Sequence, residues 1–362
     1  MGGSRPQKLG YAALIGIAVT CVLAVAFARP ATVARPDKFA YPYGSPHFTQ
    51  LIEESFRENK AGEPRRFYEW FDKAYRNWRY EHKPGPGIED ALKYKRLQLA
   101  GISDKAAKAA AQSAFAAWLH GFVKRAIPKF NLDTGFEFCN AMNRGERQCF
   151  LQSALIAGLL QKAGIDAGVV MVYRNPEGAP SNNGHAVTLI KMADGRDAVV
   201  DASHPEPFVR HLGLFVRSGA DFVYVEPVYT RVPTRIQGYA TTSGYRKLAT
   251  SQVAPMGFNS VRSQFYYYRG ERAKGGLLAK RPTADGLRLA ERYLSTSVRL
   301  CPDNPLAVYM LGRVHQAQGK LSLAAKEFER AYQLYQRFGW VPQGAKEFFA
   351  LTHARAATSS RR

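Results

Sequence analysis

The spacing of apolar side chains predicts a run of helices in the first part of the chain. Residues 47–60 and 64–81 carry apolar positions one, three or four apart, and in the second segment these positions are aromatic with Lys and Arg between them. Two more helices are expected over 88–99 and 103–126, the latter with Ser103 as its N-cap. An aromatic stripe at helical spacing is usually core, so these helices are expected to pack on the segment that follows.

After residue 130 the pattern changes from helical spacing to the alternation of strands. Residues 131–148 have a loop composition, and a strongly apolar helix is expected from Cys149 to about Ala163. Strands are then expected over 168–173, 185–192, 196–202, 221–229 and, less regularly, 237–248. Helices followed by an antiparallel sheet give an α+β fold class.

A tight turn over residues 193–195 is expected to join two of these strands into a hairpin. If Gly195 is left-handed in a three-residue loop, Val187 lies opposite Asp201, and His185 is the diagonal neighbour of Asp201 on the same face. Diagonal neighbours are roughly 7–8 Å apart at the backbone, within reach of two side chains. The hairpin therefore predicts a hydrogen bond between Asp201 and His185.

The C-terminal part returns to helical spacing after about residue 258. Small and apolar residues in 304–334 fall at the offsets of a tetratricopeptide repeat: Leu311, Gly312, Gly319, Ala324, Phe328 and Ala331. A degenerate earlier copy precedes it, with a first helix over 263–273 and Gly270 at the small position. Two repeats are short for an independent solenoid, so they are expected to pack on the preceding domain.

The N-terminus has the features of a targeting segment. Arg5 and Lys8 precede an uncharged run to Ala28, which reads as a signal peptide or as an uncleaved membrane anchor. Cys21 as a lipoprotein site is a weaker interpretation, because apolar residues continue after it. Both main interpretations predict an extracytoplasmic protein. The predicted division is 1–28 leader or anchor, 29–46 linker, 47–257 catalytic domain with its N-terminal helices, 258–338 helical repeats and 339–362 tail.

The charge balance narrows the classes of partner. The formal net charge is +22, which favours an anionic partner such as an envelope polymer or a lipid, although a solvated cationic surface explains it equally well. Zinc-finger spacing, a P-loop and RNP-type aromatic motifs are absent from the sequence, which argues against nucleic acid. No metal-ligand spacing is found among the eight histidines, and no cofactor is expected.

Three cysteines follow the leader: Cys139, Cys149 and Cys301. An odd number is no disulfide framework, so at least one thiol is expected to stay free; a Cys139–Cys149 disulfide is the structural alternative. Cys149 stands at the expected N-terminus of a helix, where the dipole and unpaired N–H groups favour a thiolate and can receive an oxyanion. It is therefore the candidate nucleophile.

The residues around this cysteine supply candidates for the other catalytic roles. His185 opens a strand and is the candidate base, Asp201 ends the paired strand and is the candidate orienting acid, and His204 is the rival to His185. Asn143 and Gln148 are weaker candidates for donating to the oxyanion, since each is more often an ordinary loop residue.

Residues 130–210 resemble the transglutaminase-like superfamily, relatives of papain-fold cysteine peptidases. The resemblance lies in a cysteine that opens a helix, the pattern LxxxGI-x-A within Leu159–Ala167, and a histidine and an aspartate on the strands that follow. The tryptophan that often follows the family's histidine and its D-P-T motif are replaced here by Ala186-Val187 and Asp201-Ala-Ser.

The resemblance implies that Cys149, His185 and Asp201 form a catalytic triad acting on a protein or peptide amide, as a peptidase or amidase or as an acyl transferase. Two other classes stay open. A catalytically inactive binding module is favoured by the missing tryptophan, and an envelope scaffold that holds a protein partner through its repeats is favoured by the basic charge and the repeats.

Overall fold

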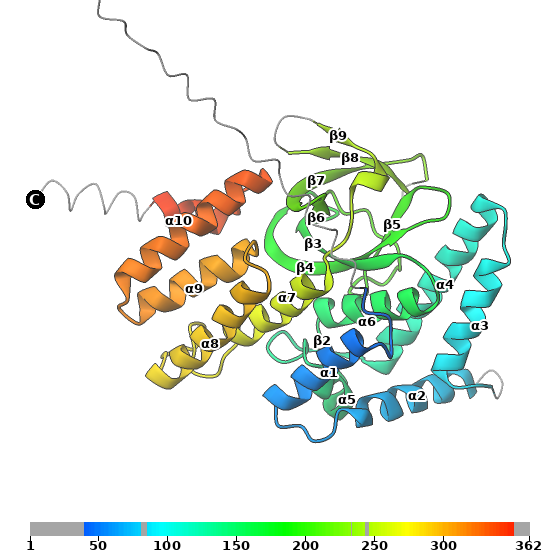
Figure 1. Cartoon of the computed structure of the whole chain (residues 1–362), viewed down its shortest axis with the longest axis horizontal. Coiled ribbons are helices and arrows are strands. Elements are labelled where there is room, and N and C mark those ends of the chain that lie inside the picture. The colour runs from blue at the N-terminus through cyan, green and yellow to red at the C-terminus, as the bar shows by residue number, and fades with distance from the viewer. Residues whose placement is uncertain (1–39, 81–84, 233, 243–245, 351–362) are drawn as a thin grey trace, which may run out of the picture. The chain divides into compact units, whose positions relative to one another are not determined.

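The structure is a computed structural model that describes residues 40–350 apart from 81–84, 233 and 243–245 (Figure 1). The expected leader, Cys21, most of the expected linker and residues 351–362 lie outside the described residues. The described chain combines helices with one main antiparallel sheet, so the α+β class is confirmed. Among the described helices, none combines the length and the apolar character needed to cross a bilayer.

Four helices precede the sheet, close to their expected bounds: α1 (Pro46–Glu58), α2 (Arg65–Tyr80), α3 (Ile88–Ala100) and α4 (Lys105–Ala126). The aromatic stripe of α2 is core, because Phe67 and Phe71 are fully buried. The rings of Phe71 and Phe122 on α4 lie 5.2 Å apart. The N-cap of α4 is Asp104 rather than Ser103, since the Asp104 carboxylate accepts from the N–H of Ala107 at 2.7 Å.

The segment expected to be a loop contains three short elements: β1 (Lys129–Phe130), α5 (Phe138–Arg144) and β2 (Glu146–Arg147). β1 and β2 form a small parallel pair. Gly145 ends α5 in a left-handed conformation with φ 67°, which suits glycine. Seven residues are too few for a helical pattern to stand out, so the loop composition of 131–148 concealed α5.

The long apolar helix is α6 (Cys149–Lys162), which begins at the expected residue. The main sheet follows: β3 (Ala167–Arg174), β4 (Pro180–Lys191), β5 (Asp197–Val200), β6 (Gly213–Ser218), β7 (Asp221–Tyr229), β8 (Ile236–Thr241) and β9 (Lys247–Leu248). Its order is β5-β4-β3-β6-β7-β8-β9, with every neighbouring pair antiparallel. A further pairing of Asp197 with Ile236 joins β5 to β8 and closes the sheet into a barrel.

The two faces of the strands explain how α6 is held. One face fills the barrel with side chains such as Val170, Val187 and Val216. The other face belongs to a second core cluster that includes α6, almost every residue of which is buried. Figure 1 shows α6 beside β3 and β4, with α1 and α5 on its far side. A helix enclosed on both sides needs apolar residues all round, which is the pattern of α6.

The hairpin of β4 and β5 has the register that its turn predicts. Thr188 pairs with Val200 and Leu189 with Val199, and continuing this register places Val187 opposite Asp201. Gly195 is left-handed, with φ 81°. β4 starts at Pro180, earlier than expected, because it continues to pair with β3 as far as Arg174.

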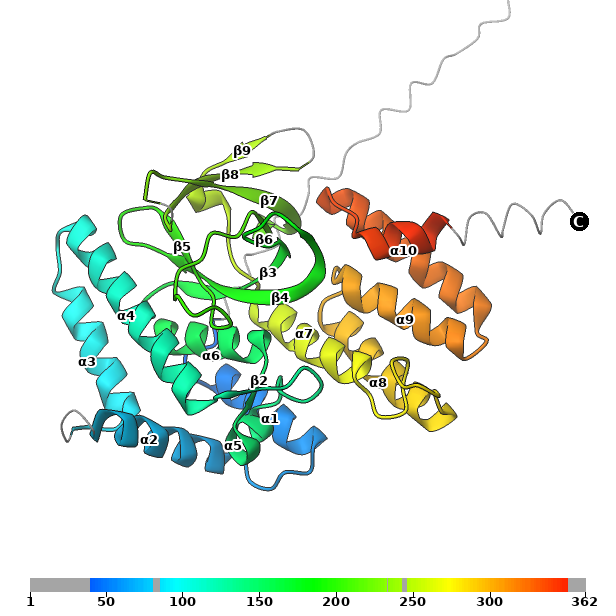
Figure 2. The ribbon, with the colours of Figure 1, turned by 180° about the vertical axis from the view of Figure 1, so that it is seen from behind.

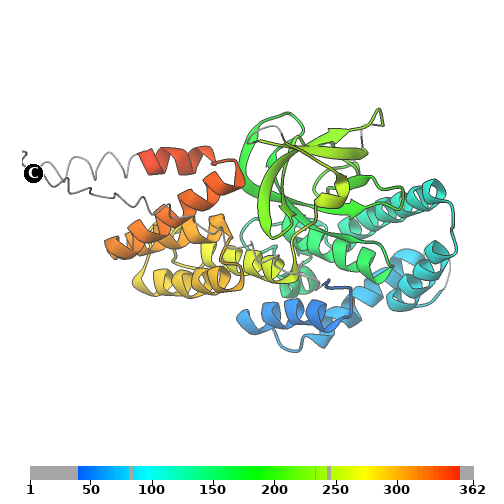
Figure 3. The same ribbon diagram turned by 45° about the horizontal axis from the view of Figure 1, so that its top comes forward.

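The C-terminal part forms α7 (Phe258–Glu271), α8 (Ala284–Leu300), α9 (Pro305–Ala317) and α10 (Leu321–Phe338), seen side by side in Figures 1 and 3. Two glycines allow close contact, as expected: a Cβ added to Gly312 would lie 2.7 Å from the Phe328 ring, and one added to Gly270 would lie 2.5 Å from Leu294 Cγ. The tetratricopeptide assignment itself stays a prediction.

Part of the expected linker and part of the expected tail are folded and pack on the rest of the described chain. Tyr41 and Tyr43 are buried, and the N–H of Tyr43 donates to the carbonyl of Gly158 on α6 at 2.8 Å. After α10, the ring of Trp340 lies 4.8 Å from that of Tyr173. Residues 343–350 are helical, and Phe349 among them is buried. Aromatic side chains in both segments supply the apolar area that holds them on the fold.

Candidate active site

Cys149 is the first residue of α6, and Gln148 before it has the extended backbone of an N-cap residue. The Cys149 side chain is nearly buried, with 6% of the residue exposed. Its thiol points toward the carbonyl of Gly184, with Sγ 3.8 Å from the oxygen. The candidate nucleophile therefore lies where the first N–H groups of a helix have no partner within the helix.

His185 is placed by β4 and Asp201 follows directly after β5. His185 Nε2 and Asp201 Oδ2 are 2.8 Å apart, which is the hydrogen bond that the hairpin register predicts. The second oxygen of the carboxylate, Oδ1, accepts from the N–H of Ser203 at 2.9 Å. Asp201 is thereby fixed by the chain that leaves the strand, and it holds the imidazole in one orientation.

The protonation of this pair follows from the same contacts. Burial lowers the pKa of His185, but hydrogen bonds to Asp201 and to Cys149 outweigh it and raise the pKa to about 10. Burial likewise raises the pKa of Asp201, but hydrogen bonds from His185 and His211 hold it well below its usual range. The site thus favours an imidazolium beside a carboxylate. Because Nε2 of His185 is bonded to Asp201, Nδ1 is the nitrogen that can serve the thiol.

His211 is a member of the site that sequence reasoning missed. Its Nε2 lies 3.0 Å from the same Asp201 Oδ2, and the residue is 2% exposed. Tyr229 donates its hydroxyl to the carbonyl of His211 at 2.8 Å, which ties the loop to β7. Nδ1 of His211 is buried and has no hydrogen-bond partner among the described residues. His211 lies in an irregular loop beyond the hairpin, where no periodicity indicates which way a side chain points.

The ring of His204, the rival base, makes no described hydrogen bond to Cys149, His185 or Asp201. Its side chain is exposed, and its Nδ1 accepts from the N–H of Glu206 at 3.0 Å. Its carbonyl accepts from His120 Nε2 at 3.0 Å and from Lys124. His204 therefore anchors α4 to the loop after β5.

Neither oxyanion candidate makes a described hydrogen bond to the triad. Asn143 is exposed near the end of α5. The Gln148 amide N–H donates to the Leu132 carbonyl at 3.4 Å, and its own carbonyl oxygen is buried without a partner in the described part of the chain. The backbone N–H groups at the start of α6 are the donors that the geometry supports best.

Two further residues lie close enough to Cys149 to interact with it electrostatically. Arg147 on β2 donates to Gln152 Oε1 at 3.0 Å, while its Nε is buried without a described partner. Burial lowers the pKa of Arg147, and the charge of the nearby Cys149 offsets only part of this shift. Tyr268 on α7 is buried, and burial followed by the charge of Cys149 raises its pKa well above the usual value. A helix assigned to the C-terminal repeats therefore reaches the thiol site, which the sequence could not indicate.

The other two cysteines are placed differently. Cys139 and Cys301 are free and buried, and no disulfide joins Cys139 to Cys149 in the described structure. Burial raises the pKa of Cys139 to about 11 and also raises that of Cys301. Both are expected to remain as neutral thiols, whereas Cys149 interacts with His185, whose pKa is raised to about 10.

His185, Asp201 and His211 form the only group found among the described residues that could hold a metal ion. One ligand atom each from His185, Asp201 and His211 lies within 4.8 Å of the others. A set of two imidazoles and one carboxylate matches known zinc and non-haem iron sites. The hydrogen bonds to Asp201 satisfy the carboxylate without a metal, so the geometry fits both interpretations.

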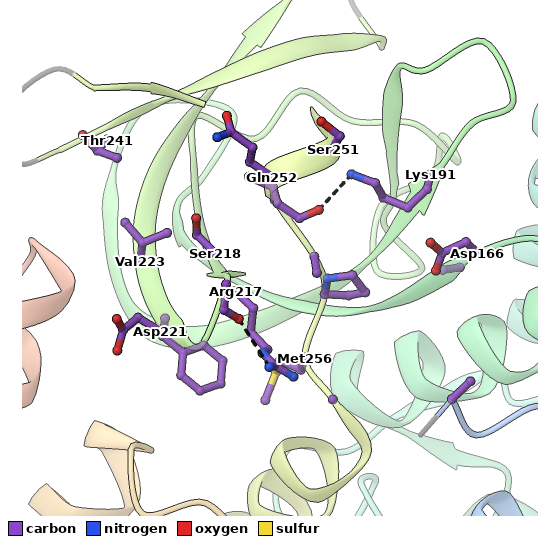
Figure 4. Close-up of a pocket in the computed structure, with 18 of the residues that line it drawn as sticks. Asp166, Lys191, Arg217, Ser218, Asp221, Val223, Thr241, Ser251, Gln252 and Met256 are labelled. Carbon is purple, nitrogen blue, oxygen red and sulfur yellow. Dashed lines mark hydrogen bonds between the residues drawn. The ribbon is translucent and has the colours of Figure 1, made fainter. Parts of the chain in front are cut away.

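A cavity of about 1150 Å³ with a mixed polar and apolar lining lies elsewhere, and Figure 4 shows some of its lining residues. Cys149, His185 and Asp201 are not among them. Gln161, near the far end of α6, lines it, so the cavity is about one helix length, ~20 Å, from Cys149. Lys191 in this cavity is committed to structure, because it donates to Asp197 Oδ2 at 2.8 Å and to the carbonyls of Thr250 and Val253.

No protein family and no curated protein matches the sequence. Among solved structures, the chain is similar to menin, in a crystal structure that reveals the binding site for Mixed Lineage Leukemia (MLL) protein. The identity is 10% and the TM-score 0.37, and the match covers 80% of this chain and 61% of the menin chain. The chain thus spans less than two thirds of menin, and a likeness this weak supports no statement about function.

Proposed function

We propose that this protein is a thiol enzyme that acts on amide bonds through a transglutaminase-like domain. Cys149 is its nucleophile, His185 its acid and base, and Asp201 the residue that orients His185. The observation that carries the proposal is a cysteine that opens α6 with its Sγ 3.8 Å from the carbonyl of Gly184, the residue before a histidine whose Nε2 is 2.8 Å from a buried carboxylate.

The chemistry follows from the protonation of the site. The thiolate of Cys149 attacks an amide carbonyl, a C–S bond forms, and the oxyanion faces the N–H groups at the start of α6. The C–N bond then breaks as the His185 imidazolium gives its proton to the leaving amine, which leaves a thioester. His185 next takes a proton from water, the water oxygen attacks the thioester, and the acid is released with the thiolate restored. An amine in place of water would make the enzyme a transferase.

The proposed substrate is a protein or peptide, and hydrolysis is the favoured outcome because bacterial members of the resembling superfamily are more often peptidases. The proposed setting is extracytoplasmic, which rests on the apolar N-terminal run. An anionic envelope polymer or lipid as a partner rests on the net charge of +22.

Selective alkylation tests the thiol directly. Wild-type protein is treated with iodoacetamide at pH 7, and each cysteine is followed by peptide mass mapping. Cys149 should react at least tenfold faster than Cys139 and Cys301, whose pKa values burial raises. His185→Gln should remove this advantage. Equal rates for all three cysteines in wild type would instead favour a non-catalytic binding module or an envelope scaffold.

Activity tests the reaction. Residues 30–362 are screened against a peptide-amide library with and without an added amine. Cys149→Ala and Cys149→Ser should both be inactive, because a hydroxyl is far less acidic than a thiol. Cys139→Ala should keep activity. Asp201→Asn should weaken activity without unfolding the chain. An active Cys149→Ala variant would exclude the thiol mechanism.

The second candidate function is a metal centre built by His185, Asp201 and His211, which their clustering within 4.8 Å favours. In that case zinc or ferrous ion binds purified protein with one-to-one stoichiometry, and Cys149→Ala retains both the metal and any activity. The thiol proposal expects the reverse: activity persists after chelation and is lost in Cys149→Ala.

A further inference from the structure

An apolar cavity of about 770 Å³ lies among α2, α3 and α4, away from the thiol site. Five of its lining residues are aromatic: Tyr75 and Trp78 on α2, Tyr94 on α3, and Phe115 and Trp118 on α4. Figures 1 and 2 both show α3 running alongside α4, with α2 crossing near one end of the pair. The cavity has the volume and the apolar lining typical of small-molecule sites.

Part of this lining is open to solvent rather than closed by the protein. Tyr94 is 62% exposed, while Trp78 and Trp118 are only partly buried. The rings of Trp78 and Trp118 meet edge to face, with their centroids 4.8 Å apart. Leaving apolar area in water costs about 25 cal/mol per Å². An apolar occupant would recover that free energy.

The charge in the lining of the cavity is positive. Lys95 on α3 is the one charged residue in the described lining, and its Nζ lies 5.5 Å from the centroid of the Phe115 ring. No described ion pair joins Lys95 to a carboxylate. Outside the lining, the guanidinium of Arg125 on α4 lies 6.0 Å from the ring of Trp78, which is a lining residue. An occupant with a negative group would therefore meet cations beside the rings.

We propose that this cavity binds a monomeric single-chain amphiphile with an anionic head group, of the chemical class of a long-chain fatty acid. The acyl chain lies along the apolar lining that α3 and α4 provide, against the paired rings of Trp78 and Trp118, and the head group lies beside Lys95. The apolar lining favours an acyl chain, and Lys95 favours a negatively charged head group. The inference is independent of the thiol mechanism, because none of the cavity's residues belongs to the active site.

Tryptophan fluorescence provides the test, because Trp78 and Trp118 line the cavity while Trp70 and Trp340 do not. The full folded chain is titrated with a long-chain fatty acid brominated at mid-chain, below its micelle concentration. Wild type should show saturable quenching. Ala114→Phe, which places a ring into the cavity, should weaken binding at least tenfold. Ala110→Phe, on an exposed position of the same helix, should leave it unchanged.

A second pair of variants tests the head group. Lys95→Met should weaken binding of the acid about tenfold and leave binding of its uncharged methyl ester unchanged. Lys93→Met, an exposed lysine on the same helix, is the matched control and should behave as wild type. Circular dichroism and thermal melts establish that each variant is folded.

Several outcomes would overturn the proposal. Quenching that does not saturate, or that is equal in wild type and Ala114→Phe, would mean nonspecific partition. Equal binding of acid and ester by wild type would exclude the head-group role of Lys95. Binding to anionic lipid vesicles that Ala114→Phe does not affect, without uptake of the monomeric acid, would assign the charge to a membrane surface instead.

Discussion

At the scale of single residues, one carboxylate oxygen of Asp201 serves two imidazole rings. His185 Nε2 and His211 Nε2 lie 2.8 and 3.0 Å from Oδ2, and both rings must carry a proton on that nitrogen. A catalytic dyad needs only the first of these bonds. The second one also fixes the carboxylate, so in the proposed mechanism His211 is a positioning residue that acts through Asp201.

Replacing His211 should therefore reduce activity without removing it. A hydrogen bond to a charged group contributes about 1.5–3 kcal/mol, which corresponds to roughly ten- to hundredfold in rate if it acts on the transition state. His211→Gln should lower kcat with little change in KM, while His185→Gln abolishes activity. A purely structural role for His211 would instead lower thermal stability and leave kcat per folded molecule unchanged.

The raised pKa of His185 gives a pH dependence with a defined sign. The folded pKa is about 10 and the ordinary value is 6.5, so the stabilisation from the imidazolium is complete below pH 6.5 and is lost as pH rises toward 10. The difference in melting temperature between wild type and His185→Gln should be largest near pH 6 and shrink toward pH 10. His204→Gln, an exposed control, should show no such trend. A difference that grows with pH would refute the ion pair.

At the scale of elements, the helices and strands with regular apolar spacing could be predicted from the sequence, and the short or irregular segments could not. The helices from α1 to α4, the start of α6 and the β4–β5 register follow from periodicity and from one left-handed glycine, Gly195. Short α5, the loop that carries His211, and the approach of Tyr268 to Cys149 depend on tertiary packing. The spacing of residues along the chain does not predict those contacts. Cys149, His185 and Asp201 could be predicted because they lie at the start of a helix and on a hairpin.

The contact between α9 and α10 gives an element-scale prediction. A side chain on Gly312 would collide with the Phe328 ring, since even a Cβ would lie 2.7 Å from it. Gly312→Leu should lower the free energy of unfolding by about 1–3 kcal/mol, measured by urea denaturation. Gly121→Ala on α4, where an added Cβ meets nothing within 4 Å, is the control and should not destabilise. Unchanged stability in Gly312→Leu would contradict the packing.

At the scale of the whole described chain, α7 joins the C-terminal helices to the part that holds Cys149, His185 and Asp201. Arg269 on α7 donates to both oxygens of Glu137, at 2.7 and 2.9 Å, and both side chains are 4% exposed. Arg262 on the same helix forms an ion pair with Glu54 on α1. The ring of Phe265 lies 4.9 Å from that of Phe150, next to Cys149. The boundary expected after residue 257 therefore separates segments that share one core.

Breaking the Arg269–Glu137 pair should destabilise the whole unit. Arg269→Met leaves Glu137 buried without its partner, a change that costs about 3–5 kcal/mol. Urea unfolding followed by near-UV circular dichroism and by Cys149 alkylation should give one coincident transition at lower urea, and Arg269→Met/Glu137→Gln should recover part of the loss. Two separate transitions would show that the C-terminal helices fold on their own.

Closure of the barrel also governs how copies of this chain can meet. A free sheet edge offers unpaired N–H and C=O groups on which a strand from another molecule can align, the first step of aggregation. Here the pairing of Asp197 with Ile236 joins β5 to β8. The terminal strand beyond it, β9, has only two residues, and one of them is the exposed Lys247. A short edge that carries a positive charge is a poor template for strand addition, so the sheet keeps crowded molecules from joining edge to edge.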